Sequence, residues 1–393
     1  MVLWYFGSLF GAAFFITYYI RNVVQRPLLL NSSGKFRKFL ENNVSLTKRK
    51  FWPTVWCFES RAQTVISSLV RGQVLPDIQY TREILQLKDG GEVALDWRFP
   101  LTATEETPVV VILPGLTGGS QTDYVKGLVL QCHKTRIRAV VFNNRGIGGI
   151  TLKTPRTYCG SNFEDLSEVL EHVNVRFPAA LVGAVGISMG GLILGNYLAG
   201  KGEEATKHLS AAMLISVPWD VFKGTESIEK PILNRLLNYH LAGCLCKVLA
   251  GVREVVEPAG LGNIDNCLKS SSIREFDSNF TSKQFGYKDV TDYYNHATLH
   301  NKLHKICLPT LCLSAGDDPF QPFEAIPVDA ANNSDHVAIV VTARGGHIGF
   351  MEGLWPFHQN QYMFELFAQF FESMFYRNGY KLLNSYKLEE RID

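Results

Sequence analysis

The residue best placed for nucleophilic chemistry is Ser188, in the stretch Gly-Ile-Ser-Met-Gly over residues 186–190. An apolar run typical of a buried strand precedes it over residues 180–187, and a segment with helical character follows over residues 190–198. The serine is therefore expected in a sharp turn between strand and helix, where glycines permit close packing and the hydroxyl stands exposed. The alternative is an ordinary glycine-rich turn, which the strand and the helix on either side disfavour.

A serine hydroxyl is a weak nucleophile unless a neighbouring base removes its proton. His347 follows the apolar run over residues 336–342 and is flanked by glycines, in Arg-Gly-Gly-His-Ile-Gly. These glycines would let the imidazole turn toward the serine. The other histidines lie mostly in segments with helical or loop character, so His347 is the predicted general base.

The acid that orients the histidine should follow a strand between Ser188 and His347. Hydrolases whose nucleophile sits in such a strand-to-helix turn carry the three residues in the chain order serine, acid, histidine. Asp317 and Asp318 come directly after a late apolar run, over residues 308–314, and both meet this demand. Asp220 follows an earlier run and is the other candidate. The residues alone leave the choice of acid open.

Ester cleavage also needs backbone N–H groups aimed at the oxygen that becomes negative in the transition state. The amide of Met189, directly after the serine, is the first predicted donor. The second is expected from the glycine-rich loop over residues 114–119, where Leu116 is the candidate. Alternatively, this loop is a glycine-rich turn without a catalytic part.

These residues need a rigid sheet to position them, and the sequence predicts one. Short apolar runs separated by segments of helical character indicate parallel strands that are buried on both faces. A hairpin over residues 83–99 precedes them. The runs cover residues 108–113, 138–142, 180–187, 211–217, 308–314 and 336–342. These runs predict an α/β sheet with crossover helices. Together with the nucleophile turn at Ser188, they predict an α/β-hydrolase fold over residues 80–393, with a mostly parallel central sheet and helices on both of its faces.

The long stretch between the strands at residues 217 and 308 contains no convincing strand. Within it, residues 231–252 place leucines at helical spacing, which predicts an amphipathic helix. We interpret the insertion, from about residue 221 to residue 305, as a helical lid. The alternative is that its apolar stripe simply packs on the core.

The first twenty residues carry no charged side chain and include eight aromatic ones. We predict a transmembrane signal-anchor over residues 1–20, followed by a basic connector over residues 21–79. A cleaved signal peptide is disfavoured, because the segment lacks a charged start and an Ala-x-Ala-like site. The protein is thus expected to be a single-pass membrane protein of the endoplasmic reticulum or another endomembrane. Basic residues after the anchor favour a cytosolic domain, whereas four Asn-x-Ser/Thr sequons would be used only in the lumen, so the orientation stays open.

Composition excludes several other classes of function. The balance of 39 basic and 37 acidic residues gives no reason to expect nucleic acid as a partner. The eight cysteines lack the spacing of a disulfide scaffold or a zinc site. Residues 195–201 imitate a phosphate-binding loop, but Gly202 replaces the hydroxyl residue that would hold magnesium, and no dinucleotide-binding glycine motif occurs. We predict neither a metal nor a cofactor.

Six ordered motifs resemble the family 4 α/β hydrolases. They are Leu-Pro-Gly-Leu-Thr-Gly-Gly at residues 113–119, Phe-Asn-Asn-Arg-Gly at 142–146, Thr-Pro-Arg-Thr-Tyr at 154–158, Gly-Ile-Ser-Met-Gly-Gly at 186–191, Ala-Gly-Asp-Asp at 315–318 and Gly-Gly-His-Ile-Gly at 345–349. Together with the apolar N-terminus, they look like the membrane-bound eukaryotic branch of abhydrolase-domain proteins. The resemblance implies a triad of Ser188, Asp318 and His347, and an esterase or phospholipase that cleaves acyl esters of glycerophospholipids such as phosphatidylcholine.

The sequence therefore predicts a membrane-anchored serine hydrolase with a lipid substrate and no cofactor. One alternative is an acyltransferase on the same fold, which would pass the acyl group to an acceptor other than water. Some relatives in the wider superfamily carry a His-x4-Asp box for that reaction, and its absence from this sequence counts only weakly against the alternative. The other alternative is a catalytically silent, membrane-tethered binding module, which would have a broken triad, whereas all three positions are filled here.

Overall fold

A nine-stranded mixed sheet runs through the centre of the structure, in the strand order β1-β9-β8-β7-β6-β4-β5-β3-β2. The structure is a computed structural model and describes residues 2–31, 34–356 and 360–389. Strands β4 to β9 pair in parallel, whereas β1, β2 and β3 pair antiparallel at the two ends of the sheet. The strands are β1 (Leu28–Leu30), β2 (Thr81–Gln86), β3 (Glu92–Arg98), β4 (Val109–Leu113), β5 (Arg138–Asn143), β6 (Val182–Ile187), β7 (Ala211–Ile215), β8 (Thr310–Ala315) and β9 (Val337–Thr342).

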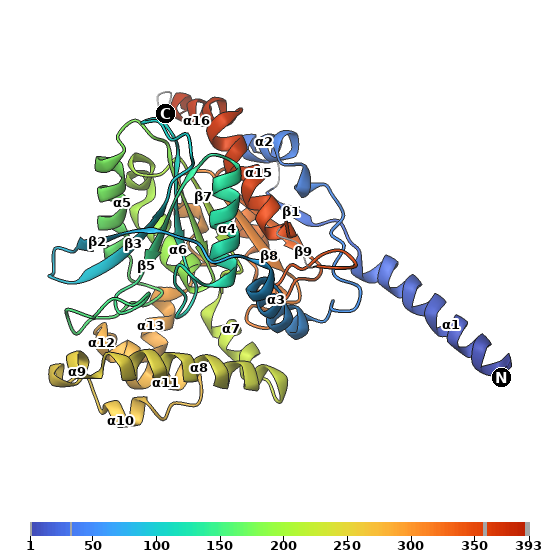
Figure 1. The fold of residues 1–393 in the computed structure, drawn as a ribbon, viewed down its shortest axis with the longest axis horizontal. Coiled ribbons are helices and arrows are strands. Elements are labelled where there is room, and N and C mark those ends of the chain that lie inside the picture. The colour runs from blue at the N-terminus through green and yellow to red at the C-terminus, as the bar shows by residue number, and fades with distance from the viewer. Residues whose placement is uncertain (1, 32–33, 357–359, 390–393) are drawn as a thin grey trace.

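The parallel strands are buried on both faces, which explains why their sequences are continuously apolar rather than alternating. Two sets of helices cover the sheet (Figure 1). One face carries α2 (Lys35–Asn43), α4 (Asp123–Lys134), α15 (Tyr362–Tyr376) and α16 (Gly379–Glu389). The opposite face carries α5 (Glu164–Arg176), α6 (Met189–Lys201) and α14 (Val328–Asn332). The predicted α/β-hydrolase architecture, with helices on both faces, is confirmed.

The stretch between β7 and β8 is helical throughout its regular parts and lies at one end of the sheet (Figure 1). Every residue from 221 to 305 is described, and none of them lies in a strand. Several of these helices share a separate apolar cluster, which includes Leu249, Val256, Phe276 and Phe280. The helices are α7 (Val221–Ile228), α8 (Leu233–Gly251), α9 (Arg253–Val256), α10 (Ile264–Cys267), α11 (Ile273–Phe276), α12 (Ser282–Gln284) and α13 (Val290–Ala297), with a π-helical turn η5 (Asp277–Thr281) after α11. We refer to residues 221–305 as the helical insertion.

Helix α1 (Val2–Tyr18) projects away from the rest of the molecule (Figure 1). It has 17 residues, the lower limit of the roughly 17 to 25 that a membrane-spanning helix needs. After it the backbone changes to a π-helical turn, which carries Arg21 and buries Tyr19 and Val23. Within the described part of the chain, no helix is long and apolar enough to cross a membrane. The prediction of a transmembrane helix over residues 1–20 is therefore wrong, and so is that of a single-pass endomembrane protein; Met1 lies outside the described residues.

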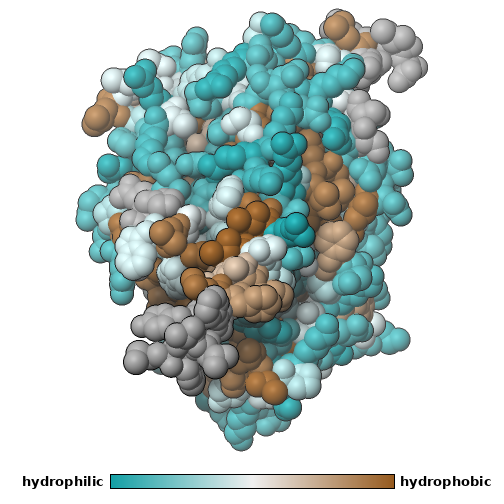
Figure 2. All heavy atoms as spheres, turned by 90° about the vertical axis from the view of Figure 1, so that its right-hand side faces the viewer, coloured by the Kyte–Doolittle hydropathy of each residue, from teal (hydrophilic) through white to brown (hydrophobic). Residues whose placement is uncertain are grey.

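Apolar side chains also gather on the face from which α1 projects, as Figure 2 shows. Trp52 packs against Tyr19 in the π-helical turn after α1, with the two ring centroids 6.4 Å apart, and remains about half exposed. Trp56 and Leu354 come from distant parts of the chain but lie side by side, because the indole Nε1 of Trp56 donates to the Leu354 carbonyl at 3.1 Å. Both side chains are exposed.

The segment over residues 21–79 packs closely on the sheet. Its short strand β1 pairs with β9, and Phe36 and Leu40 of α2 are fully buried in the core. Its last helix, α3 (Ser60–Val74), begins at a cap in which the Glu59 carboxylate accepts from two amides of the first turn. The predicted boundaries at residues 20 and 79 stay a prediction, but the segment between them contributes to both the core and, through α3, the site described below.

Candidate active site

The turn between β6 and α6 holds Ser188 in a strained conformation, with a φ of 51° and a ψ of −115°. Residues other than glycine rarely adopt a positive φ, so the surrounding structure must impose it. A Cβ atom on Gly186 would lie 2.4 Å from the carbonyl oxygen of Gly190, and one on Gly190 would lie 2.2 Å from that of Leu113. The two glycines are therefore required for β6, α6 and β4 to approach one another around the serine.

Three of the predicted site residues meet where β6, β8 and β9 end. The Nε2 atom of His347 lies 2.9 Å from Oγ of Ser188, and its Nδ1 atom lies 2.8 Å from Oδ2 of Asp318. Asp318 is buried, and its other oxygen accepts a hydrogen bond from the Phe320 amide at 2.8 Å. The Phe320 ring lies 4.3 Å from the imidazole, centroid to centroid. This series of contacts could pass the serine proton to the imidazole while the carboxylate stabilises the resulting cation.

The other two candidate acids are engaged elsewhere. Oδ1 of Asp317 accepts a hydrogen bond from the Gly346 amide at 3.0 Å, and burial raises the pKa of this carboxyl to about 7. Asp220 caps α7, where its Oδ1 accepts from two amides of the first turn. Among the described residues, neither carboxylate bonds to His347, so the geometry brings Asp318 alone to the histidine.

The loop after β4 leaves one amide free beside the serine. Its Gly115 lies against Ser188, where a Cβ atom on the glycine would be 3.3 Å from the serine Cβ. The amides of residues 115 and 117 donate to the phenol oxygens of Tyr124 and Tyr158, each at 2.9 Å. The Leu116 amide between them has no partner in the part of the chain that the structure describes, and neither has the Met189 amide. Both predicted oxyanion donors are thus available, and two tyrosines that sequence reasoning missed hold the loop.

The serine and the histidine open into a cavity of about 600 Å³. Its walls are mostly apolar. The helical insertion and helix α3, which both lie outside the sheet, contribute lining residues. The helical insertion supplies Leu237 and Leu241 of α8, among others, and α3 supplies Val65 and Leu69. Leu116 and Met189 also line the cavity, so the residues with the two free amides, the serine and the apolar walls all border the same space. Such a cavity suits a ligand with an ester group and a long apolar part.

Comparison with known proteins decides the family of this chain, since the family described as alpha/beta hydrolase fold matches residues 108–354. The chain belongs to the α/β-hydrolase fold family. It is 40% identical over 371 residues to the Phospholipase ABHD3 of Bos taurus, which covers 93% of this chain and 88% of that one. Against the Phospholipase ABHD3 of Homo sapiens it is 40% identical over 362 residues, with 91% and 87% covered. Against the Putative esterase YheT of Escherichia coli it is 32% identical over 292 residues, with 74% and 84% covered. The resemblance to the abhydrolase-domain branch is confirmed, and the chain is a hydrolase that acts on esters.

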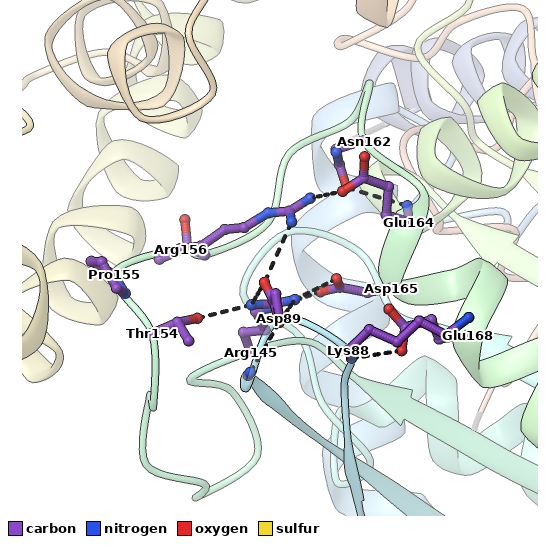
Figure 3. A network of polar contacts seen from close by, with 12 residues as sticks. Lys88, Asp89, Arg145, Thr154, Pro155, Arg156, Asn162, Glu164, Asp165 and Glu168 are labelled. Atoms are coloured by element: carbon purple, nitrogen blue, oxygen red, sulfur yellow. Dashed lines mark hydrogen bonds and ion pairs between the residues drawn. The ribbon is translucent and has the colours of Figure 1, made fainter.

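A buried arginine in the Asn-Asn-Arg-Gly motif of the hydrolase holds the segment around Thr154 in place (Figure 3). Arg145 is 2% exposed and forms paired hydrogen bonds to Asp165, both of 2.7 Å, and to Asp89, of 2.7 and 2.9 Å. It also donates to the Thr154 hydroxyl at 2.9 Å. Thr154 lies in the same loop as Tyr158, between β5 and α5, and the oxygen of Tyr158 accepts from the Thr117 amide in the loop after β4. The motifs at residues 142–146 and 154–158 are therefore connected by hydrogen bonds, and together they support the loop after β4.

The described residues of the hydrolase contain no group of three or more His, Cys, Asp or Glu side chains that could hold a metal ion. All eight cysteines are free thiols, and five of them are buried. Burial raises the pKa of Cys132 and Cys312, which keeps these thiols protonated and poorly reactive. The buried cysteines therefore act as packing residues.

Another buried carboxyl of the hydrolase, Asp277, lies in the wall of the cavity. It belongs to the π-helical turn η5, its Oδ2 accepts from the Tyr294 hydroxyl at 3.1 Å, and burial raises its pKa to about 7. In the unfolded chain an aspartate has a pKa of about 3.9. Between these two values the folded state holds a proton that the unfolded state has released, so the contribution of Asp277 to stability falls as the pH rises from about 4 to about 7.

Replacing Asp277 by asparagine is expected to stabilise the hydrolase more at pH 8 than at pH 5. The asparagine oxygen still accepts from Tyr294, while the loss of stability that the aspartate suffers between about pH 4 and pH 7 is absent. The gain at pH 8 has an upper limit of about 4 kcal/mol, at 1.36 kcal/mol per pKa unit. Thermal unfolding of both proteins at the two pH values measures it, and an equal difference in Tm at pH 5 and pH 8 would contradict the expected titration.

Proposed function

We propose that this hydrolase cleaves acyl esters of lipids, and that its substrates are glycerophospholipids such as phosphatidylcholine. The observation that carries the proposal is the series of contacts from Ser188 through His347 to Asp318 at the wall of a large apolar cavity. Support also comes from the relatives that are named phospholipase. Burial of an acyl chain contributes about 0.8 kcal/mol per CH₂, so an apolar cavity favours a lipid over a small polar ester.

In the proposed reaction, His347 removes the proton from the Ser188 hydroxyl as Oγ attacks the ester carbonyl carbon. The amides of Leu116 and Met189 stabilise the negative oxygen of the tetrahedral intermediate. Collapse of this intermediate breaks the ester bond, and the imidazolium gives its proton to the leaving alkoxide of the lysophospholipid. A water molecule then attacks the acyl-enzyme with His347 again as base, which releases the fatty acid and restores the serine.

Hydrolysis of phosphatidylcholine in mixed detergent micelles tests the proposal. Purified protein is expected to release fatty acid and lysophosphatidylcholine in equal amounts, and pretreatment with a fluorophosphonate, which labels activated serines, should stop the release. The matched control is a diether analogue of the same lipid, which has the same shape but no ester carbonyl to attack. Cleavage of a short soluble ester but of no phospholipid would contradict the assignment of the substrate.

The same assay separates hydrolysis from acyl transfer. With glycerol or a lysophospholipid present as acceptor, a hydrolase delivers the acyl group to water and the yield of free fatty acid stays unchanged. Accumulation of the acylated acceptor at the expense of free fatty acid would instead identify an acyltransferase on the same fold. Both results require Ser188, so they concern the acceptor and not the nucleophile.

A further inference from the structure

We propose that helix α3 is a brace for the catalytic histidine, which means that its hydrogen bonds fix the position of the backbone at His347. Thr64 is the central positioning residue of this helix. The inference rests on the proposed function, because it assigns His347 the role of general base. Helix α3 (Ser60–Val74) lies outside residues 108–354, the part of the chain that the family match covers. It is therefore a support from outside the part of the fold that the family match covers.

The first turn of α3 contacts both segments that carry the proposed acid and base. The Ser60 hydroxyl donates to the carbonyl oxygen of Asp317, the residue before the acid, at 2.5 Å. The Thr64 hydroxyl accepts from the backbone N–H of His347 at 2.9 Å and donates to the Ser60 carbonyl at 2.9 Å. One turn of helix thus ties the loop after β8 to the loop after β9, in addition to the direct contact between Asp318 and His347.

The glycines on either side of His347 allow this contact. A Cβ atom on Gly346 would lie 2.2 Å from the Ser60 carbonyl oxygen, and Gly346 has a φ of 58°. A Cβ atom on Gly349 would lie 2.9 Å from the Gln63 carbonyl oxygen. The sequence suggested that these glycines let the imidazole turn. In the structure they let the loop over residues 343–351, which carries His347 and which we call the histidine loop, pack directly on the backbone of α3.

Two buried side chains on the same face of α3 extend the brace. Gln63 is fully buried, and its side chain both accepts from the Met351 amide at 2.9 Å and donates to the Met351 carbonyl at 3.2 Å. Arg71 donates to the carbonyls of Ile348 and Gly349 at 3.0 and 3.1 Å, while its Nε pairs with Asp123 at 2.6 Å. The spacing of residues 60, 63, 64 and 71 places these groups on one side of the helix. One helix therefore contacts the histidine loop from Gly346 to Gly349 and again at Met351.

Replacing Thr64 by valine tests the brace, because valine keeps the shape of threonine and removes the acceptor. We expect kcat for ester hydrolysis to fall roughly 10- to 100-fold with little change in KM, since a small displacement of a catalytic base has costs of this size. Thr64→Ser retains the hydroxyl and is expected to restore most of kcat. Gln73→Ala, an exposed position on the same helix, is the matched control and should behave as the wild type.

Hydrogen–deuterium exchange of the His347 amide gives a readout that does not depend on turnover. Thr64→Val should accelerate this exchange and leave exchange in the β-strands unchanged, and Ser60→Ala, a second variant, should accelerate it to a smaller extent. If Thr64→Val raises KM but leaves kcat and the exchange unchanged, α3 is only a wall of the cavity and the inference fails. If the wild type shows no Ser188-dependent hydrolysis, the proposed function fails, while the exchange rates still decide whether α3 holds the loop.

Discussion

Replacing Ser188 by alanine is expected to reduce ester hydrolysis by about 10⁴- to 10⁶-fold. The variant loses the only atom that can form the acyl-enzyme, while the free amides of Leu116 and Met189 and the apolar cavity remain. Any residual rate would come from these amides and from binding alone. Turnover of phosphatidylcholine and covalent labelling by a fluorophosphonate are the two measurements.

The alanine variant should fold normally, because alanine has no atom beyond Cβ and occupies the same backbone position. Thermal unfolding checks this point, and Ser271→Ala, an exposed serine on the helical insertion, serves as the control for labelling. Labelling of the Ser188→Ala protein at the wild-type level would place the nucleophile elsewhere. Absence of labelling in the wild type would favour the catalytically silent binding module.

Much of the fold could be predicted because its signals are local. Strands such as β6 are buried on both faces, so their sequences are continuously apolar and stand out between helical segments. The strand–turn–helix around Ser188 needs Gly186 and Gly190 for close packing, and those glycines are visible in the sequence. Helix α8 was found through its leucine spacing for the same reason. In each case the residues that reveal the element are the residues that build it.

The rest depends on contacts between distant parts of the chain. The three residues of β1 form a strand only because β9 lies beside them, and no local pattern of that length indicates pairing. The role of α3 rests on Thr64 and Arg71 meeting a loop about 280 residues away, at His347 to Gly349. The apolar start of the chain matched the composition of a membrane span, but α1 ends at Tyr18, where the backbone changes to a π-helical turn that packs on the molecule. The mean hydropathy of a segment does not indicate where a helix within that segment ends.

The choice between two adjacent aspartates is a further limit of the sequence, and substitution decides it. Asp318→Asn is expected to lower kcat about 10³- to 10⁴-fold, because the amide cannot stabilise the protonated imidazole and favours the wrong tautomer of His347. Asp317→Asn keeps an oxygen that can accept from the Gly346 amide, so its effect on kcat should be small. Asp220→Asn should be nearly neutral, since asparagine caps a helix as well as aspartate does.

Each asparagine has the shape of the aspartate that it replaces, so the three variants differ mainly in which charge is removed. Steady-state kinetics on one substrate and thermal unfolding of all three proteins provide the comparison. A large loss confined to Asp318→Asn, without a matching loss of stability, would mean that this carboxylate acts on the histidine during the reaction. A larger loss in Asp317→Asn would mean instead that the histidine loop changes partner when substrate binds. In that case the 2.8 Å contact between Asp318 and His347 would belong to the resting enzyme only.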